Sequence, residues 1–370
     1  MAMAIDTKPV TEIEGRAERN RLWVRLWLYV VCLLVFAMVM VGGATRLTDS
    51  GLSITEWKLF LGILPPLSHA QWISEFEKYK LIPEYSQVNH GMSLLQFQFI
   101  YWWEWSHRFL GRIVGFVFFL PLVWFWATGR IEPHIKPRLL VLLALGGLQG
   151  FVGWWMVSSG LTERVDVSQY RLATHLTLAC AIFAYSLWVA RGLAQPVHAP
   201  AAPGLRRLAG FFVLAVLAQI FLGGLVAGLD AGLAFNDWPT MDHAVVPGGL
   251  LVLEPVWRNF FENPKTVQFV HRCFAYGVLA LALVQWLARA GAAAAFRRGA
   301  AVLAVLVLCQ AGLGVVTLML QVPLHWALAH QAGAVIVLWA AVAHWRALTG
   351  VYPVRTAAAA SPAQAGAAAG

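Results

Sequence analysis

Four histidines lie inside apolar runs of this 370-residue chain, and they fall into two pairs. His107 in the first half and His271 in the second are each followed at once by an arginine. His175 and His330 come later in the two halves, at a similar spacing after the first histidine. Polar residues at membrane depth are costly to bury and usually functional. The repetition therefore indicates one kind of site that occurs twice.

Imidazoles on two facing helices can supply both axial ligands of a haem iron. We predict that His107 and His175 bind one haem iron and that His271 and His330 bind another. A single intramembrane histidine more often forms a hydrogen bond to a neighbouring helix, but four at equivalent positions favour ligation. The other histidines lack the pattern and are expected in solvated or interfacial positions: His69, His90, His134, His198, His243, His325 and His344.

Composition places these histidines in a membrane. The chain is 59% hydrophobic and only 12% charged, and its mean hydropathy is +0.66, which is far too apolar for a soluble protein of this length. Eight runs are long enough to cross about 30 Å of hydrocarbon. They are predicted near 26–44, 100–127, 139–157, 172–190, 208–228, 267–287, 300–320 and 325–347.

The net charge of +9 does not indicate a nucleic-acid partner, because the basic residues lie between the spans instead of forming one stripe. Most of them fall in alternate, short loops, as the positive-inside rule requires of cytoplasmic loops. We predict a multi-pass protein of the bacterial inner membrane with both termini in the cytoplasm. Cys32, Cys180, Cys273 and Cys309 lie in apolar spans without CxxC spacing, so they are expected to be small buried side chains without disulfide or zinc.

The two halves repeat each other beyond the histidines. A constant difference in residue number, which we call the repeat offset, relates Gly42-Gly43 to Gly223-Gly224, Asp49 to Asp230, Gly51 to Gly232 and Trp57 to Trp238. Four spans per repeat return the chain to the same side of the membrane. The predicted fold is therefore an all-α membrane protein with eight transmembrane helices, arranged as two tandem four-helix bundles related by a pseudo-two-fold axis along the membrane normal.

The predicted domains follow from this repeat. They are a cytoplasmic N-terminal segment (1–25), an N-terminal bundle (26–190), a cytoplasmic linker (191–207), a C-terminal bundle (208–347) and a disordered tail (348–370).

Polar residues next to the first histidine of each half suggest further roles. Arg108 and Arg272 could hold a haem propionate with forked hydrogen bonds or extend to lipid phosphate. Glu104 lies three residues before His107 and shares its helix face, whereas the equivalent residue in the second half is Gln268. A carboxylate near only one haem places the chemistry in the first half, although a helix-dipole role for Glu104 is the alternative.

The chain resembles the haem A synthase family. The resemblance rests on five segments and spans residues 25 to 347: the run from Gly42 to Trp57, Glu-Trp-Ser-His-Arg at 104–108, Leu-Ala-Thr-His at 172–175, Val-His-Arg at 270–272 and Ala-His-Gln at 329–331. It implies oxidation of the C8 methyl group of haem O to the formyl group of haem A, for cytochrome oxidase assembly. It also implies that His107 and His175 flank haem O, that Glu104 lies near the reacting edge, and that His271 and His330 ligate a haem b.

The resemblance further implies partners: haem O synthase (a protohaem farnesyltransferase), cytochrome oxidase assembly factors, an electron donor such as a ferredoxin, and a homo-oligomer. The chain lacks the outer-loop cysteine pair of some bacterial relatives, so a redox role of that pair does not apply here. Two alternatives stay open at this point. One is a di-haem b-type membrane electron carrier, and the other is a haem-handling chaperone or transporter without oxidation chemistry.

Overall fold

The computed structural model describes residues 10–57, 61–194, 200–287 and 294–349. Within these ranges the regular elements are helices, and eight of them are long and apolar enough to cross a membrane. In lipid a helix satisfies all its backbone hydrogen bonds internally, which explains why apolar runs of this length fold as helices. The eight are α1 (Val10–Leu47), α4 (Leu94–Ala127), α5 (Lys136–Val157), α6 (Gln169–Gly192), α7 (Pro203–Gly228), α10 (Pro264–Leu287), α11 (Ala294–Met319) and α12 (Leu324–Leu348).

All eight predicted spans are confirmed, and several helices are longer than predicted. Helix α1 starts at Val10, inside the segment predicted as 1–25. Helix α4 starts at Leu94 because Ser93 and Gln96 form a reciprocal capping box there. The predicted disordered tail, 348–370, lies outside the described residues from 350 onward.

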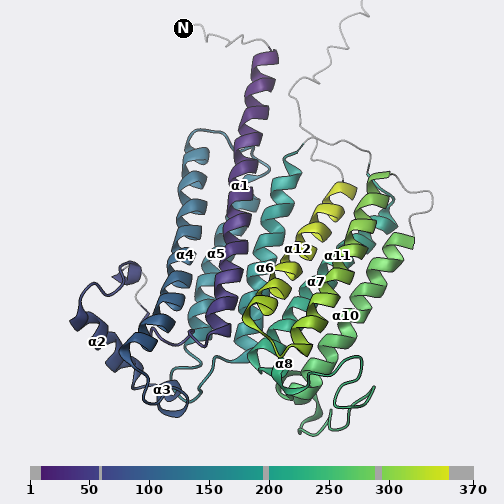
Figure 1. Ribbon diagram of the computed structural model, residues 1–370. Coiled ribbons are helices and arrows are strands. Elements are labelled where there is room, and N and C mark those ends of the chain that lie inside the picture. Colours follow the sequence, from purple (N-terminus) through teal and green to yellow (C-terminus); the bar gives the residue numbers. More distant parts are fainter. Residues whose placement is uncertain (1–9, 58–60, 195–199, 288–293, 350–370) are drawn as a thin grey trace, which may run out of the picture.

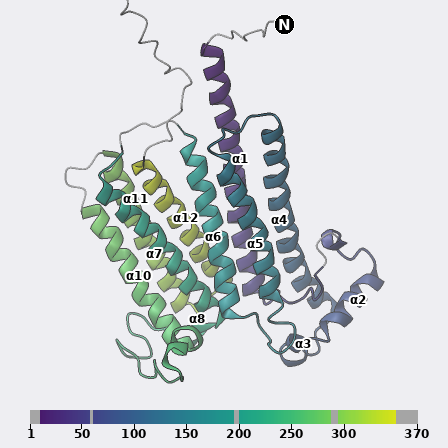
Figure 2. The same cartoon turned by 180° about the vertical axis from the view of Figure 1, so that it is seen from behind.

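The two halves of the chain lie side by side (Figures 1 and 2). Helices α1, α6, α7 and α12 pack against one another at the centre, where α6 meets α7 and α1 meets α12 across the halves. Helices α4 and α5 flank this centre on one side, and α10 and α11 flank it on the other. The largest apolar core runs through the central helices.

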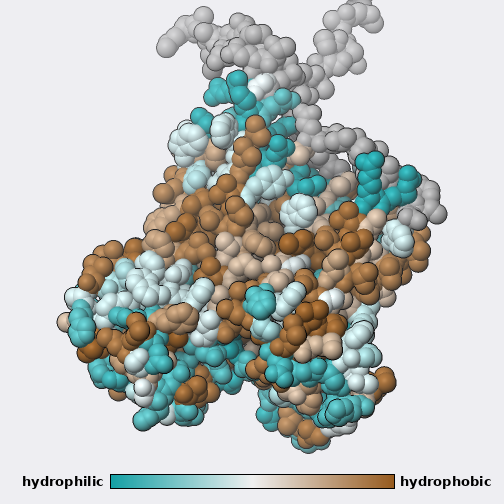
Figure 3. Space-filling model, viewed as in Figure 1, coloured by the Kyte–Doolittle hydropathy of each residue, from teal (hydrophilic) through white to brown (hydrophobic). Residues whose placement is uncertain are grey.

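On the face that Figure 3 shows, apolar side chains dominate the middle of the molecule, and hydrophilic side chains become more frequent toward its ends. We call the end with the short helices the cap end; it carries η1 (Leu61–Ile63), α2 (His69–Tyr79), α3 (Pro83–Gln87), α8 (Ala231–Ala234), η2 (Val256–Arg258) and α9 (Asn259–Glu262). The start of α1 and the end of α12 lie at the opposite end, which we call the terminal end.

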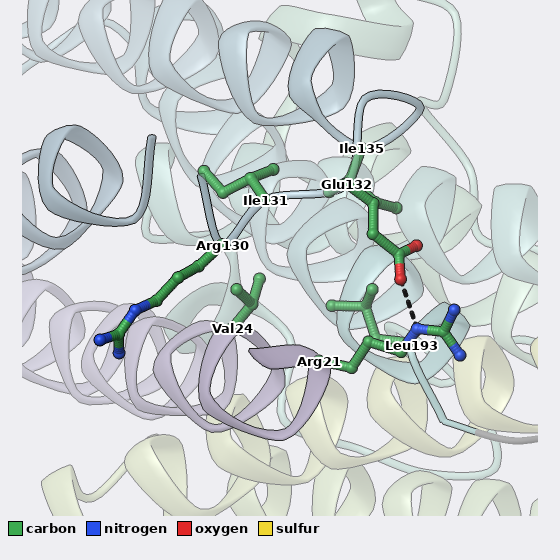
Figure 4. Close-up of a pocket in the computed structure, with 7 residues that line it drawn as sticks. All are labelled: Arg21, Val24, Arg130, Ile131, Glu132, Ile135 and Leu193. Atoms are coloured by element: carbon green, nitrogen blue, oxygen red, sulfur yellow. Dashed lines mark hydrogen bonds and ion pairs between the residues drawn. The ribbon is translucent and has the colours of Figure 1, made fainter. Parts of the chain in front are cut away.

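An ion pair fastens the terminal end of the first half. Arg21 of α1 donates to Glu132 of the α4–α5 loop, and Figure 4 shows the two side chains meeting beside Val24 and Leu193. Arg130 lies on the same loop. The predicted cytoplasmic loops thus gather at the end where α1 starts and α12 ends.

The cap end repeats a detail of the sequence in three dimensions. Asp49 and Asp230, which the repeat offset relates, both adopt the left-handed conformation, with φ of 47° and 48°. Arg46 lies between them and donates to Asp49 Oδ1 at 3.1 Å and to Asp230 Oδ2 at 2.7 Å. It also donates to the carbonyl oxygen of Ala227, its own repeat equivalent, at 3.2 Å. One arginine therefore bridges the two halves.

Candidate functional site

The four paired histidines lie at similar depth toward the cap end. His175, His271 and His330 follow the starts of α6, α10 and α12 by six or seven residues, which corresponds to about 9–10 Å along a helix. His107 lies further into α4 because that helix begins in the cap. His107 is within electrostatic range of His175, and His271 is within range of His330. The structure thus brings together the residues of each predicted pair.

Each of these imidazoles packs against a glycine of the neighbouring helix. A Cβ atom added to that glycine would meet the ring at 3.2 Å or less, so the close approach requires glycine. Measured from the added Cβ position, the nearest ring atoms are His107 Nε2 for Gly42 (3.0 Å), His175 Cε1 for Gly153 (2.9 Å), His271 Cε1 for Gly223 (3.2 Å) and His330 Cε1 for Gly314 (2.8 Å).

Three of the four rings also contact a glutamine amide on that same neighbouring helix. In each case the amide nitrogen lies by the ring Nδ1 and donates to the histidine's own carbonyl oxygen. The amide nitrogen of Gln149 lies 3.2 Å from His175 Nδ1 and 3.0 Å from the His175 carbonyl oxygen. For Gln219 and His271 both distances are 3.1 Å. For Gln310 and His330 they are 3.1 and 2.8 Å.

These glutamines fit a haem ligand. In all three the side-chain oxygen is buried without a hydrogen-bond partner among the described residues. An imidazole that binds iron through Nε2 carries its proton on Nδ1 and needs an acceptor there. Turning the amide by half a turn would offer that oxygen to the Nδ1 proton, in exchange for the bond to the histidine carbonyl oxygen. Sequence reasoning missed the three glutamines, although a single difference in residue number relates both Gln149 to Gln310 and Gly153 to Gly314.

Glu104 is 2% exposed, and its carboxylate faces the segment that follows α1. Its Oε2 accepts from Ser53 Oγ and from the Ile54 amide, both at 2.7 Å. Its Oε1 accepts from Arg108 at 2.6 and 3.0 Å. In the second half, Gln268 donates to the Phe235 carbonyl oxygen instead.

The two arginines that follow the first histidines hold equivalent loops. Arg108 donates to the carbonyl oxygens of Ile54 and Glu56. Arg272 donates to the carbonyl oxygens of Phe235 and Asp237. The repeat offset relates Ile54 to Phe235 and Glu56 to Asp237. The sequence predicts a haem propionate or a lipid phosphate as the partner of these arginines, which stays a prediction, and it does not predict these loop contacts. Arg272 Nε is buried and has no partner among the described residues, so it is one donor available to a further acceptor.

The remaining histidines mostly follow the prediction. The exposed ones are His69, His90, His134, His243 and His325. The prediction is wrong for His344, which is 5% exposed and packs against Gly299 and Phe296. His198 lies outside the described residues.

The cysteines and possible metal ligands add no further centre in the described ranges. All four cysteines are free, as predicted, but the prediction that they are buried is wrong for Cys273 and Cys309, which are exposed. The described residues contain no cluster of three or more His, Cys, Asp or Glu side chains that could hold a bare metal ion. Two histidines suit an iron whose other four ligands come from a porphyrin.

Fold and site together define a polytopic helical membrane protein with two internally repeated histidine pairs. The model of the COX15-CtaA family, described as cytochrome oxidase assembly protein, matches residues 25–342, and the chain belongs to this family.

Curated relatives cover almost the whole chain. It is 62% identical over 345 residues to the heme A synthase of Chelativorans sp. (strain BNC1), which covers 93% of this chain and 96% of that protein. It is 59% identical over 338 residues to the heme A synthase of Mesorhizobium japonicum, and the match covers 91% of this chain and 93% of that protein. It is 55% identical over 346 residues to that of Sinorhizobium medicae, with 93% and 94% covered.

Proposed function

We propose that this chain is a haem A synthase, an oxidoreductase that converts the C8 methyl group of haem O to the formyl group of haem A by successive hydroxylations and loss of water. The observation that carries the proposal is the repeated histidine site, in which every imidazole is seated on a glycine and three of four meet a buried amide. The name shared by the relatives supports it.

We assign the substrate to the first half and a resident haem b to the second, in two tandem four-helix bundles related by a pseudo-two-fold axis. Two differences between the halves support this assignment. Only the first half has a carboxylate, Glu104, beside its first histidine. In addition, α4 and α5 approach each other at only a few positions, whereas α10 and α11 pack closely. A looser pair of helices suits a haem that has to enter and leave.

In this assignment His107 and His175 hold the substrate iron, and His271 and His330 hold the haem b iron. Haem b, when bound, supplies one-electron transfer. Arg272 Nε is placed to donate to a propionate of the second haem, and Arg108 has the equivalent role in the first half in addition to its loop contacts.

Glu104 acts on the substrate through its charge. Arg108 and the Ile54 amide hold the carboxylate in one position, and in this assignment the carboxylate stabilises positive charge that develops on the substrate during methyl oxidation. Ser53 Oγ donates to Glu104 Oε2 and is the group through which a proton can reach or leave that oxygen.

A di-haem electron carrier is the second candidate, and the geometry disfavours it. Carriers that move electrons across a membrane place their haems toward opposite faces, whereas all four histidines here lie toward the cap end. A haem-handling chaperone would share the ligands and lack the oxidation.

One experiment separates these classes. The chain is co-expressed with a haem O-producing farnesyltransferase and purified, and its extracted haem is separated by chromatography. We expect haem A, with haem b retained in the protein. A matched His175→Ala variant should contain haem b without haem A. Haem O and haem b alone in the wild-type extract would reject the synthase and leave the chaperone or the carrier.

We further propose residence in the bacterial inner membrane with the terminal end in the cytoplasm. The clustering of basic loops at that end supports this orientation. Haem O synthase, cytochrome oxidase assembly factors, a ferredoxin-like electron donor and a homo-oligomer are the partners we propose. Reporter fusions after Arg138 and Arg207 should report the cytoplasm, and fusions within 240–260 the opposite side. The reverse pattern would overturn the orientation.

A further inference from the structure

One of the four histidines, His107, has no such glutamine amide beside it among the described residues. The repeat offset that relates Gly42 to Gly223 also relates Met38 to Gln219. Gln219 is the residue whose amide holds His271. At the equivalent place beside His107, the first half therefore has a thioether, which donates no hydrogen bond and accepts one only weakly.

The position of Met38 matches that of the missing amide. A Cβ atom on Gly111 would lie 3.4 Å from Met38 Cε. Gly111 is one helical turn after His107, at the level toward which the His107 carbonyl oxygen points. Gln219 occupies this level in the second half, where it binds the His271 carbonyl oxygen at 3.1 Å. The methyl group of Met38 thus reaches the level on α4 that corresponds to the level of the Gln219 amide on α10.

The ring of His107 is also turned relative to the other three. His175, His271 and His330 present Cε1 to their glycine, with Nδ1 as the next nearest atom. His107 presents Nε2 to Gly42, 3.0 Å from where a Cβ atom would lie, with Cδ2 next at 3.4 Å. A half-turn of the ring about its bond to Cβ converts one arrangement into the other. The three rings with an amide share one orientation, and the ring without it has the opposite one.

We propose that Met38 makes His107 the weakest of the four iron ligands, so that the haem of the first half is the one that can be exchanged. A hydrogen bond to the second nitrogen of a ligating imidazole fixes the ring and strengthens it as a ligand, and removing such a partner typically lowers metal affinity by roughly 10–100-fold. In the second half a glutamine amide lies 3.1 Å from Nδ1 of each histidine, and turning that amide places its unpartnered oxygen where it accepts the Nδ1 proton. Among the described residues of the first half, only His175 has such an amide.

This difference suits the two roles. The inference rests on the proposed function, in which the first half must bind haem O and release haem A while the second half keeps its haem b. His175 has the Gln149 amide beside its Nδ1, so a haem of the first half can stay attached on one side while the other ligand opens. The opening side lies against α1 and α4, the helices that carry Met38 and His107.

The test measures haem dissociation from the purified full-length protein loaded with haem O and haem b. Excess apomyoglobin captures the released haem, and chromatography identifies it as haem O or haem b. Met38→Gln should slow the release of haem O by about tenfold or more and leave the release of haem b unchanged. Gln219→Met should speed the release of haem b by a similar factor. The electron paramagnetic resonance signal of the first haem should shift in Met38→Gln, because its ligand ring is reoriented.

Met38→Leu is the matched control, since it removes the sulfur without adding an amide, and its haem O release should equal that of the wild type. Faster release from Met38→Leu would mean that the thioether itself holds the haem, and it would overturn the proposal. So would unchanged haem O release from Met38→Gln. If Met38→Gln takes up no haem O, unchanged haem b release from Gln219→Met would reject the proposal. If the rates change as expected but the wild type makes no haem A, the proposed function fails, and the inference that His107 is the weakest iron ligand stands.

Discussion

The segments that follow the first helix of each half share an anchor and differ in charge. In both, an arginine after the first histidine donates to two carbonyl oxygens of the segment, at equivalent positions of the repeat. In the first half the same arginine also pairs with Glu104, whose other oxygen binds Ser53 and Ile54. In the second half Gln268 binds only one carbonyl oxygen. The comparison shows how a duplicated frame can keep its geometry while one half gains a fixed negative charge.

The largest expected effect separates the two halves by their haem content. His330→Ala removes an axial ligand, so haem b should be lost from the second half while the first half still takes up haem O. The measurement is the ratio of each haem to protein, with the optical spectrum of the reduced protein. His325→Ala, an exposed histidine of the same helix, should keep both haems. Full haem b in His330→Ala would show that His330 is not a ligand.

The next prediction concerns the carboxylate that distinguishes the first half. Glu104→Gln keeps the size of the side chain but removes its charge and its ion pair with Arg108. Haem A formation should fall by roughly 10²–10⁴-fold, the usual contribution of a positioned acid or base, and haem O or a hydroxylated product should accumulate.

Two variants sharpen this test. Gln268→Glu should leave haem A formation near the wild-type level, because the second half does not bind substrate. Ser53→Ala removes one hydrogen bond to Glu104 and keeps the charge, so activity should fall only about tenfold or less. Wild-type haem A formation by Glu104→Gln would end the catalytic assignment of this residue.

A smaller effect is expected where glycine seats a histidine. In Gly314→Ala the new Cβ would lie 2.8 Å from His330 Cε1 and push the ring. Overpacking of this kind costs about 1–3 kcal/mol, so haem b should dissociate several-fold to a hundred-fold faster. Gly312→Ala on the same helix meets nothing within 4 Å and is the control. Equal dissociation from the two variants would show that the glycine contact does not position His330.

The smallest effect concerns the cap of the first half. Glu84 is 4% exposed, and its Oε2 has no hydrogen-bond partner among the described residues. Burial raises the pKa of this carboxyl from 4.5 to about 8, opposed by a hydrogen bond with Tyr79 and assisted by the charges of Glu104, Asp166 and Asp49. The folded cap therefore keeps the proton at neutral pH, whereas an opened cap releases it above pH 4.5.

The cap should accordingly be most stable below about pH 4.5 and lose stability as the pH rises toward 8. Hydrogen exchange of the α2 and α3 amides, corrected for its intrinsic pH dependence, measures this change. Glu84→Gln should flatten the profile and stabilise the cap by about 1–2 kcal/mol at pH 8. An unchanged profile in that variant would show that another group controls the cap.

Much of the frame could be predicted from the sequence because it depends on local pattern. Apolar run length predicted the eight spans, and the repeat offset matched Asp49 with Asp230, which share their unusual backbone conformation. The same offset relates Met38 to Gln219, but this difference between the halves gains a meaning only when the structure shows that Gln219 contacts His271. The loop contacts of Arg108 and the burial of His344 arise from packing between distant segments, which periodicity does not report.

Arg46 carries a consequence for how such a molecule can arise. It contacts its own Asp49, the equivalent Asp230 and the backbone of its own equivalent, Ala227. In an assembly of two identical four-helix chains every side chain occurs twice, so a second arginine would occupy the place of Ala227 and the two cations would repel each other. A single cation shared by both aspartates requires copies that differ in sequence, which two joined copies can do and two identical chains cannot. Gene fusion thus permits a kind of contact that dimerisation of identical chains forbids.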